Sequence, residues 1–177
     1  MKVSTDFITK INDCKISIRR EDEFGEGIKG NKYRKLKYNI IKAKNINSKG
    51  LITFGGAFSN HLYATALAGK LNGIKTFGIV RGEEWSSKQK MNPTLSNCVK
   101  YGMKLFFVSR SVYKKKNTPS FWNLINLFPE NLYVIPEGGT NDLAIQGTSE
   151  MLQEEDVIYD SLCCPVGTGG TIAGLLK

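Results

Sequence analysis

One lysine in this chain has neighbours that could make it a nucleophile. Lys32 lies in the stretch Lys29 to Leu36, directly after Gly30-Asn31, which can end a loop and cap a helix. In the first turn of a helix the unpaired backbone N–H groups disfavour a positive charge, and burial would disfavour it further. The neutral amine that results could form a Schiff base with an aldehyde. The alternative is an ordinary solvated lysine in a basic helix.

A second stretch has the composition of a carboxylate site. Ser59 and Asn60 follow a short apolar strand and Gly55-Gly56, where a helix is expected to begin. Free N–H groups at a helix start and these two side chains could hold an anion together, although either residue could simply cap the helix. His61 is the single histidine, and no acid at a matching spacing supports a catalytic base, so a structural imidazole is favoured.

The third stretch, Gly167-Thr168-Gly169-Gly170-Thr171, indicates a phosphate loop. Its glycines let the backbone approach an anion closely, and the hydroxyls of Thr168 and Thr171 can donate to phosphate oxygens. A dinucleotide fingerprint would need glycine at Ile172, and a P-loop would need Gly-Lys-Ser/Thr, so a small monophosphate remains. A structural glycine turn is the alternative. An activatable lysine, a carboxylate site and a monophosphate loop are together what pyridoxal phosphate requires.

Alternating elements predict the α/β fold that must position these residues. We expect a short lead-in over 1–14 and an exposed polar connection over 109–120, away from any site. Strands are predicted at 14–20, 51–54, 75–80, 105–108, 132–135 and 157–164, and helices at 32–45, 60–71, 93–101, 121–127, 142–155 and from Thr171 onward. The first helix should bury Tyr33, Leu36, Ile40 and Ile41, with Lys35, Lys37, Lys42 and Lys44 mostly on other faces.

Composition limits the classes of function. The chain has 177 residues, 41% of them hydrophobic, which is typical of a globular protein. It shows no membrane-length apolar run and no signal-peptide core, so a cytoplasmic protein without membrane contact is expected. Its four cysteines (Cys14, Cys98, Cys163 and Cys164) have no framework spacing, and the last two are expected on a buried strand.

A net charge of +9 keeps nucleic acid among the candidate partners. The positive residues are scattered, however, and no aromatic-basic binding signature accompanies them. Charge of this sign also suits a protein that binds phosphate and carboxylate.

Four motifs together resemble a known family. They are Gly30 to Leu36, Phe54 to His61, Pro136-Glu137-Gly138-Gly139-Thr140-Asn141 and Val166 to Thr171. In this order they look like the family of 1-aminocyclopropane-1-carboxylate deaminase and D-cysteine desulfhydrase. The resemblance implies a pyridoxal-phosphate enzyme with the tryptophan synthase β-subunit fold, in which two three-layer lobes surround parallel sheets. It also implies a small amino-acid substrate, a homodimer and no binding of nucleic acid.

The resemblance also implies roles for individual residues. Lys32 would bind the cofactor aldehyde and move protons, and Asn60 would contact the phenolic oxygen of the cofactor. Ser59, with Asn60, His61 and the following backbone, would hold the substrate carboxylate. Gly167, Thr168, Gly169, Gly170 and Thr171 would bind the phosphate. The smaller domain would comprise residues 45–140, and the larger domain 1–44 with 141–177.

Two departures from the family qualify this expectation. Deaminases typically have Gln-Ser-Asn-Gln where this chain has Phe58-Ser59-Asn60-His61, so the ending resembles the desulfhydrases and puts ring opening of the cyclopropane in doubt. Family members also continue past the phosphate loop, so the larger domain is expected to be incomplete here. A lyase or deaminase acting on a small amino acid is therefore the first hypothesis. The second is a catalytically incomplete remnant that binds phosphate ligands or a partner chain.

Overall fold

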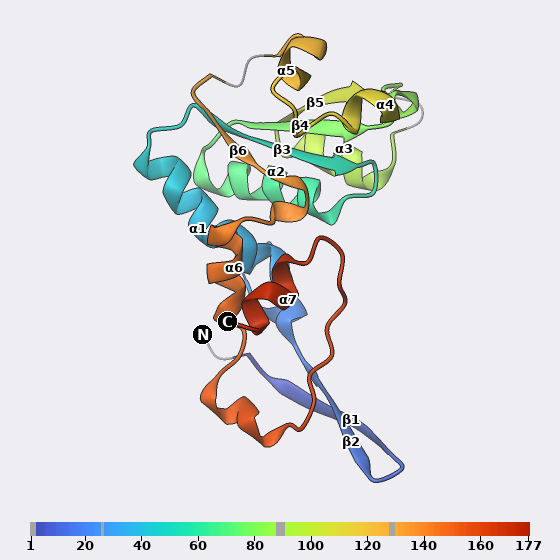
Figure 1. Ribbon diagram of the computed structural model, residues 1–177, viewed down its shortest axis with the longest axis vertical. Helices are drawn as coiled ribbons and strands as arrows, with labels where there is room; N and C mark the ends of the chain where they lie inside the picture. Colours follow the sequence, from blue (N-terminus) through green and yellow to red (C-terminus); the bar gives the residue numbers. More distant parts are fainter. Residues whose placement is uncertain (1–2, 26, 88–90, 128–129) are drawn as a thin grey trace.

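The molecule is elongated and has two parts (Figure 1). The computed structural model describes residues 3–25, 27–87, 91–127 and 130–177. A sheet with its helices forms one end, which we call the sheet part (residues 50–135). A β-hairpin and the segment that follows helix α6 (Asp142–Ser149) form the other end, which we call the hairpin part (residues 4–23 and 150–166). Helix α1 (Asn31–Asn45) runs between the two parts.

The sheet contains four parallel strands in the order β5-β4-β3-β6. They are β3 (Gly50–Gly56), β4 (Thr76–Arg81), β5 (Met103–Val108) and β6 (Leu132–Ile135). β3 pairs with β4 along one edge and with β6 along the other, so its residues are buried almost throughout. The predicted α/β class with a parallel sheet is confirmed, as is the strand-helix-strand unit over 51–80.

Helices α2 (Asn60–Asn72) and α3 (Pro93–Lys100) pack beside the sheet. Small residues allow α2 to lie close to β4, because a Cβ atom on Gly69 would come within 2.2 Å of Thr76 Cγ2. Gly73 ends α2 in the left-handed conformation that glycine adopts readily, which confirms the predicted stop. Two short helices, α4 (Arg110–Tyr113) and α5 (Phe121–Leu124), complete this part, and α5 ends earlier than predicted.

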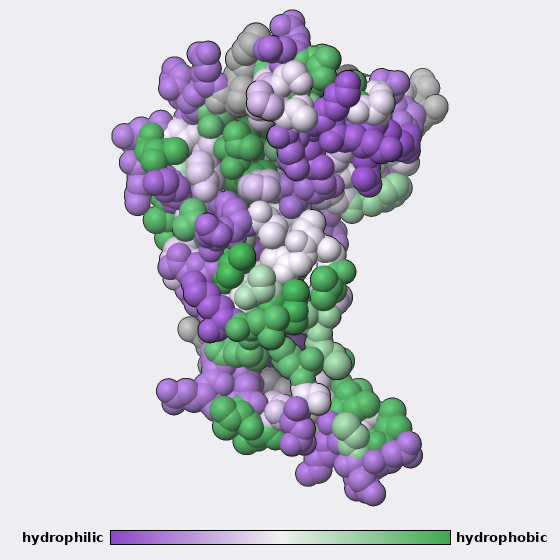
Figure 2. Space-filling model, viewed as in Figure 1, coloured by the Kyte–Doolittle hydropathy of each residue, from purple (hydrophilic) through white to green (hydrophobic). Residues whose placement is uncertain are grey.

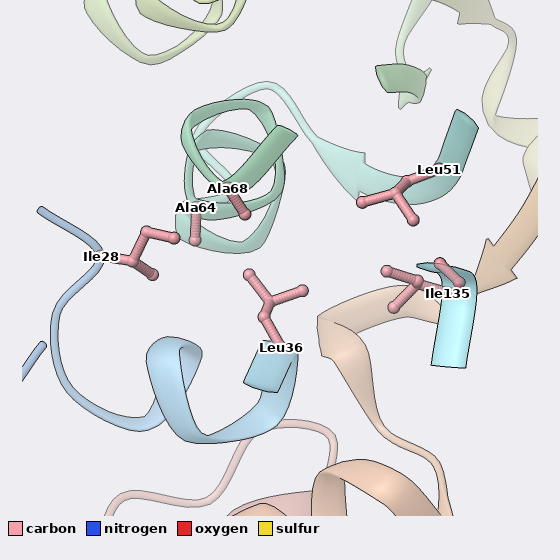
Figure 3. Packing of buried hydrophobic residues seen from close by; sticks show 7 residues of the cluster. Ile28, Leu36, Leu51, Ala64, Ala68 and Ile135 are labelled. Carbon is pink, nitrogen blue, oxygen red and sulfur yellow. The ribbon is translucent and has the colours of Figure 1, made fainter. Parts of the chain in front are cut away.

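A buried cluster joins α1 to the sheet part (Figure 3). Leu36 of α1 points toward Ala64 and Ala68 of α2, while Leu51 of β3 and Ile135 of β6 lie close together. Burying apolar surface in this way supplies most of the stability of such a domain. The position of α1 is therefore fixed against α2 and the sheet.

The apolar face of α1 differs in detail from the prediction. Leu36 is buried and Tyr33 and Ile40 pack against the same cluster, but Ile41 is exposed. Lys35, which was expected on another face, is buried. Gly30 precedes the helix with φ of 64°, and Asn31 is the first helical residue and provides no side-chain cap.

The expectation that residues 1–14 form only a short lead-in was wrong. Residues Thr5–Ile11 form β1, which pairs antiparallel with β2 (Cys14–Arg19). Asn12 and Asp13 make the turn with φ of 47° and 67°, as a tight hairpin requires. Side chains on both faces of β1 are exposed, so its sequence has no clear apolar alternation.

The strand predicted over 157–164 was also wrong. Helix α6 (Asp142–Ser149) ends earlier than expected, and Glu154–Ile158 form a short 3₁₀ helix, η5. The residues from 159 to 164 are extended coil, and Cys163 is exposed rather than buried on a strand. A parallel strand exists only through hydrogen bonds to a neighbour, and none of the described strands pairs with this segment in a sheet. Helix α7 (Gly170–Leu175) then follows.

No helix in the described ranges is both long enough and apolar enough to cross a bilayer.

Candidate active site

The predicted site residues lie at the starts of three helices. Lys32 is in the first turn of α1, Ser59 caps α2 with Asn60 and His61 in its first turn, and Gly167 to Thr171 lead into α7. The turn that follows β6, at Glu137–Gly139 (η4) and Thr140, lies among them. This turn contacts α1 and the glycine loop, and a Cβ on Gly139 would come within 2.8 Å of His61 Cε1.

Lys32 has the environment that nucleophilic chemistry requires. Its side chain is half-buried, and within the described ranges it makes no hydrogen bond and no ion pair. Burial lowers the pKa of Lys32 below the usual lysine value. A larger fraction of neutral amine is therefore present near neutral pH than for a solvated lysine.

Lys35 is a second perturbed lysine, which the sequence analysis did not select. It is 2% exposed, and its Nζ atom lies 3.4 Å from the carbonyl oxygen of Gly138 and 3.4 Å from Thr140 Oγ1. Burial, and then the charge of Lys32, lower the pKa of Lys35 to about 8. The available signal was the spacing, because residues i and i+3 of a helix share one face.

The glycine loop packs against Lys35 and the turn at Thr140. The hydroxyl oxygens of Thr168 and Thr140 are 2.5 Å apart, and a Cβ on Gly170 would come within 3.0 Å of Lys35 Nζ. Asn31 Nδ2 donates to Thr171 Oγ1 at 2.9 Å, which leaves the hydroxyl proton of Thr171 free for another acceptor. The structure thus brings the start of α1 and the loop before α7 together.

His61 is a buried, neutral imidazole. Thr53 donates its hydroxyl proton to the carbonyl oxygen of Ile135 at 2.9 Å, so it accepts a hydrogen bond from His61 Nε2, also at 2.9 Å. Burial, followed by the charges of Lys32 and Lys35, lowers the pKa of His61 to about 3. Its Nδ1 atom has no hydrogen-bond partner in the described structure. At neutral pH the ring therefore carries no charge.

Ser59 and Asn60 occupy the exposed start of α2. Ser59 Oγ accepts the backbone N–H of Leu62 at 3.2 Å, which makes it the helix cap, and its own hydroxyl proton stays available. Asn60 is exposed, and its side chain hydrogen-bonds to none of the described residues. Both side chains can therefore contact a ligand without losing a protein partner.

These residues fit an anionic aldehyde such as pyridoxal phosphate. Lys32 and Lys35 are partly or fully desolvated cations without an ion-pair partner in the described ranges, so an anion beside them would be stabilised. A Cβ on Gly167 or Gly169 would meet no atom within 4 Å, which leaves space on the outer side of the loop. Among the described residues no cluster of histidine, cysteine and carboxylate side chains could hold a metal ion.

A cavity of about 650 Å³ adjoins Ser59 and was not predicted. It is lined by Gly56, Ala57, Phe58, Ser59, Arg81, Trp85, Arg110, Tyr113, Lys114, Lys116 and Glu137. The connection over 109–120 was expected to lie away from any site, yet it supplies four of these residues. The reason is topological, because all four parallel strands end at the same edge of the sheet, where Ser59 also lies.

Comparison with known proteins gives several curated relatives. No family model matches the chain. A protein of Pyrococcus horikoshii named putative 1-aminocyclopropane-1-carboxylate deaminase is 32% identical over 171 residues, which cover 90% of this chain and 50% of that protein. The bifunctional D-cysteine desulfhydrase/1-aminocyclopropane-1-carboxylate deaminase of Arabidopsis thaliana is 29% identical, covering 93% and 45%. The chain spans about half the length of the curated relatives it matches.

Solved structures agree with these relatives. A structure described as an ACC deaminase homologue superimposes with a TM-score of 0.73 and 25% identity, over 99% of this chain and 55% of that one. Maize serine racemase gives a TM-score of 0.63 at 22% identity, over 91% and 46%, which shows a shared fold.

Proposed function

We propose that this chain is a pyridoxal-phosphate lyase or deaminase acting on a small amino acid. The premise is that the chain belongs to the family of 1-aminocyclopropane-1-carboxylate deaminase and D-cysteine desulfhydrase, although it spans only about half the length of the relatives it matches. The observation that carries the proposal is the contact between the start of α1 and the glycine loop, where Asn31, next to Lys32, donates to Thr171 and Lys35 lies against Gly170. A desolvated amine next to a phosphate-binding loop is what this cofactor needs. The residues Ser59-Asn60-His61 at the end of the second motif favour a desulfhydrase-like elimination over opening of a cyclopropane ring.

Each residue would have a defined task at the site. Lys32 Nζ would hold the cofactor through its aldehyde carbon, and Thr168, Thr171 and the glycine backbone would hold its phosphate. Lys35 lies against the same loop, so its charge would offset that of the phosphate. Asn60 would contact the phenolic oxygen.

The bound cofactor would supply an electron sink that makes the Cα–H bond of an amino acid acidic. Ser59 would donate its free hydroxyl proton to the substrate carboxylate and so orient Cα. Lys32, released as a neutral amine of lowered pKa once the substrate amino group has taken its place, would accept the proton from Cα and return it. The neutral ring of His61 would hold Thr53 and the start of α2 in place without adding charge.

The proposal is tested by adding pyridoxal phosphate to the purified chain. We expect a visible absorption band that borohydride abolishes while it attaches the cofactor covalently to the protein. Lys32→Ala should lose the band, whereas Lys29→Ala, which changes an exposed lysine three residues away, should keep it. A band that persists in Lys32→Ala would contradict the assignment.

Turnover separates the two hypotheses about activity. With D-cysteine, a desulfhydrase releases sulfide and pyruvate, and both can be measured directly. A chain that binds the cofactor through Lys32 but releases neither product, and does not open 1-aminocyclopropane-1-carboxylate, would have the function of ligand binding alone.

A further inference from the structure

The cavity beside Ser59 has a position that favours ligand binding. Its lining comes from the segments directly after β3, β4, β5 and β6, at the carboxyl edge of the sheet. Ligands of parallel α/β folds bind outside this edge, and a volume of about 650 Å³ is sufficient for a small molecule.

The charge of the lining is predominantly positive. Four cations, Arg81, Arg110, Lys114 and Lys116, face one lining carboxylate, Glu137. Lys116 pairs with Glu137 at 3.2 Å, and Arg110 pairs with Glu84 at 2.5 Å. Arg81 and Lys114 form no ion pair with any described residue, so two positive charges at the cavity remain uncompensated.

Arg81 is an exposed residue at the end of β4 and lies near two neighbours. Its guanidinium carbon lies 5.6 Å from the ring centre of Tyr113, and a Cβ on Gly56 would come within 3.5 Å of its Nη2 atom. The group therefore lies near a buried aromatic ring and the end of β3, and its N–H groups donate to none of the described residues. A fork of this kind binds a carboxylate with two parallel hydrogen bonds.

Two aromatic side chains line the cavity together with the cations. Phe58 and Trp85 meet edge to face, with ring centres 5.2 Å apart and planes at 83°. Phe58 nevertheless remains 68% exposed, although large apolar side chains usually gain from burial. The cavity thus offers an apolar surface and an unpaired guanidinium together.

We propose that this cavity binds a small organic acid, with its carboxylate on Arg81 and its apolar body against Phe58 and Trp85. Lys114 adds long-range attraction for the anion. The carboxylate has two possible sources: the side chain of an amino acid held by Ser59, or a separate metabolite. The proposal depends on the cavity alone, and it stands or falls independently of the cofactor.

Tryptophan fluorescence tests the proposal on the full chain without cofactor. The chain has two tryptophans, and Trp122→Phe leaves Trp85 as the only one. In that background we expect 3-phenylpropionate to change the emission of Trp85 with saturation. The uncharged 3-phenylpropanamide should bind about tenfold or more weakly, because a charge-assisted hydrogen bond is lost. Equal binding of acid and amide, or no saturable change, would overturn the proposal.

Variants locate the carboxylate. Arg81→Gln should weaken binding of 3-phenylpropionate about tenfold or more, and Arg81→Lys by less, since it keeps the charge but loses the fork. Lys100→Gln, an exposed change of the same charge at the end of α3, should leave the affinity unchanged. If Arg81→Gln does not fold, Lys114→Gln decides, with an expected loss of about threefold. An unchanged affinity in the folded variant would refute the site.

Competition between amino acids and 3-phenylpropionate, measured in protein loaded with pyridoxal phosphate, distinguishes the two sources of the carboxylate. D-glutamate should displace 3-phenylpropionate if the cavity receives the side chain of the substrate, whereas D-alanine should not. If a separate metabolite is the ligand, neither amino acid displaces the probe. Failure to load the cofactor would count against the proposed enzyme and would leave the result for the cofactor-free chain unaffected.

Discussion

Two apolar segments of the chain differ in burial. Leu51 to Phe54 is the centre of β3 and is buried, whereas Val157 and Ile158 are 84% and 75% exposed. β3 pairs with β4 and β6 along its two edges, and the later run pairs with no strand of the described structure. An apolar run becomes a strand only where neighbours complete its hydrogen bonds, so local sequence alone did not distinguish the two.

The same contrast holds for the two parts of the molecule. The sheet part is held by buried apolar clusters. In the hairpin part, Arg19 pairs with Asp156 at 2.8 Å and Arg34 of α1 pairs with Glu21 at 3.1 Å, while apolar side chains of β1, β2 and residues 157–166 remain exposed. Figure 2 shows hydrophobic residues across the surface of this end. The sheet part therefore depends on packing, and the hairpin part on ion pairs.

Removing Arg34 should have the largest effect. Its Nε and Nη2 atoms donate to the Glu21 carboxylate at 3.2 and 3.1 Å, and both side chains are buried. Arg34→Ala would leave the carboxylate without this partner and lower the free energy of unfolding by about 3–5 kcal/mol, as urea unfolding can measure. Arg20→Ala, which breaks exposed ion pairs, should cost far less because solvent screens these charges. Equal losses would contradict the account of the hairpin part.

A matched pair of isoleucines tests the difference in packing. Ile52→Ala removes a side chain at the centre of β3 and should cost about 2–5 kcal/mol of unfolding free energy. Ile158→Ala makes the same chemical change at an exposed position and should stay within about 0.5 kcal/mol. Urea unfolding of both variants measures the two costs. A large loss in Ile158→Ala would show that residues around 158 are buried in solution.

Acid should destabilise the sheet part through His61. Its pKa is about 3 in the folded chain, below the usual value of about 6.5, so the unfolded chain binds the proton first. Stability is therefore fully present above about pH 6.5 and falls by up to about 1.4 kcal/mol per pH unit below it, until the folded pKa is reached. In His61→Gln the loss of stability at acidic pH that His61 causes should disappear. An unchanged pH profile in the variant would contradict a buried neutral ring.

Lys35→Met should raise stability by about 1–3 kcal/mol near pH 7. The buried amine has a pKa of about 8, so its charge is disfavoured in the folded chain, and the variant removes that cost. The wild-type chain gains stability as the pH rises from about 8 toward the unfolded value, so the difference should vanish above it. Thermal unfolding across this pH range measures the effect. A destabilised variant at pH 7 would show that Lys35 is stabilised by its contacts with Gly138 and Thr140.

The motifs of the site could be read from the sequence because each depends on local chemistry. Lys32, Ser59 and Gly167 to Thr171 lie at helix starts, and glycines and caps mark those positions directly. Burial of Lys35 and its contact with Thr140 could not be read in the same way, since they arise where segments about a hundred residues apart pack together.

Errors in the predicted fold have a common physical cause. The run at 157–164 has strand-like composition without a partner, and the hairpin at 5–19 has partners without a buried face. The periodicity of apolar residues indicates which positions are buried. Whether an edge or a face of a strand is buried depends on the elements that pack beside it. The cavity was missed for the same reason, because its lining is assembled from the ends of four strands.

The most direct test of the claim that Lys32 binds the cofactor is to determine which lysines become labelled by it. The chain is incubated with limiting pyridoxal phosphate near pH 7, reduced with borohydride, digested and analysed by mass spectrometry. We predict that Lys32 carries nearly all of the label, because burial lowers its pKa and the neighbouring Asn31 contacts Thr171 of the glycine loop that would hold the phosphate. Label shared equally between Lys32 and the exposed Lys29, or found mainly on Lys35, would contradict the assignment.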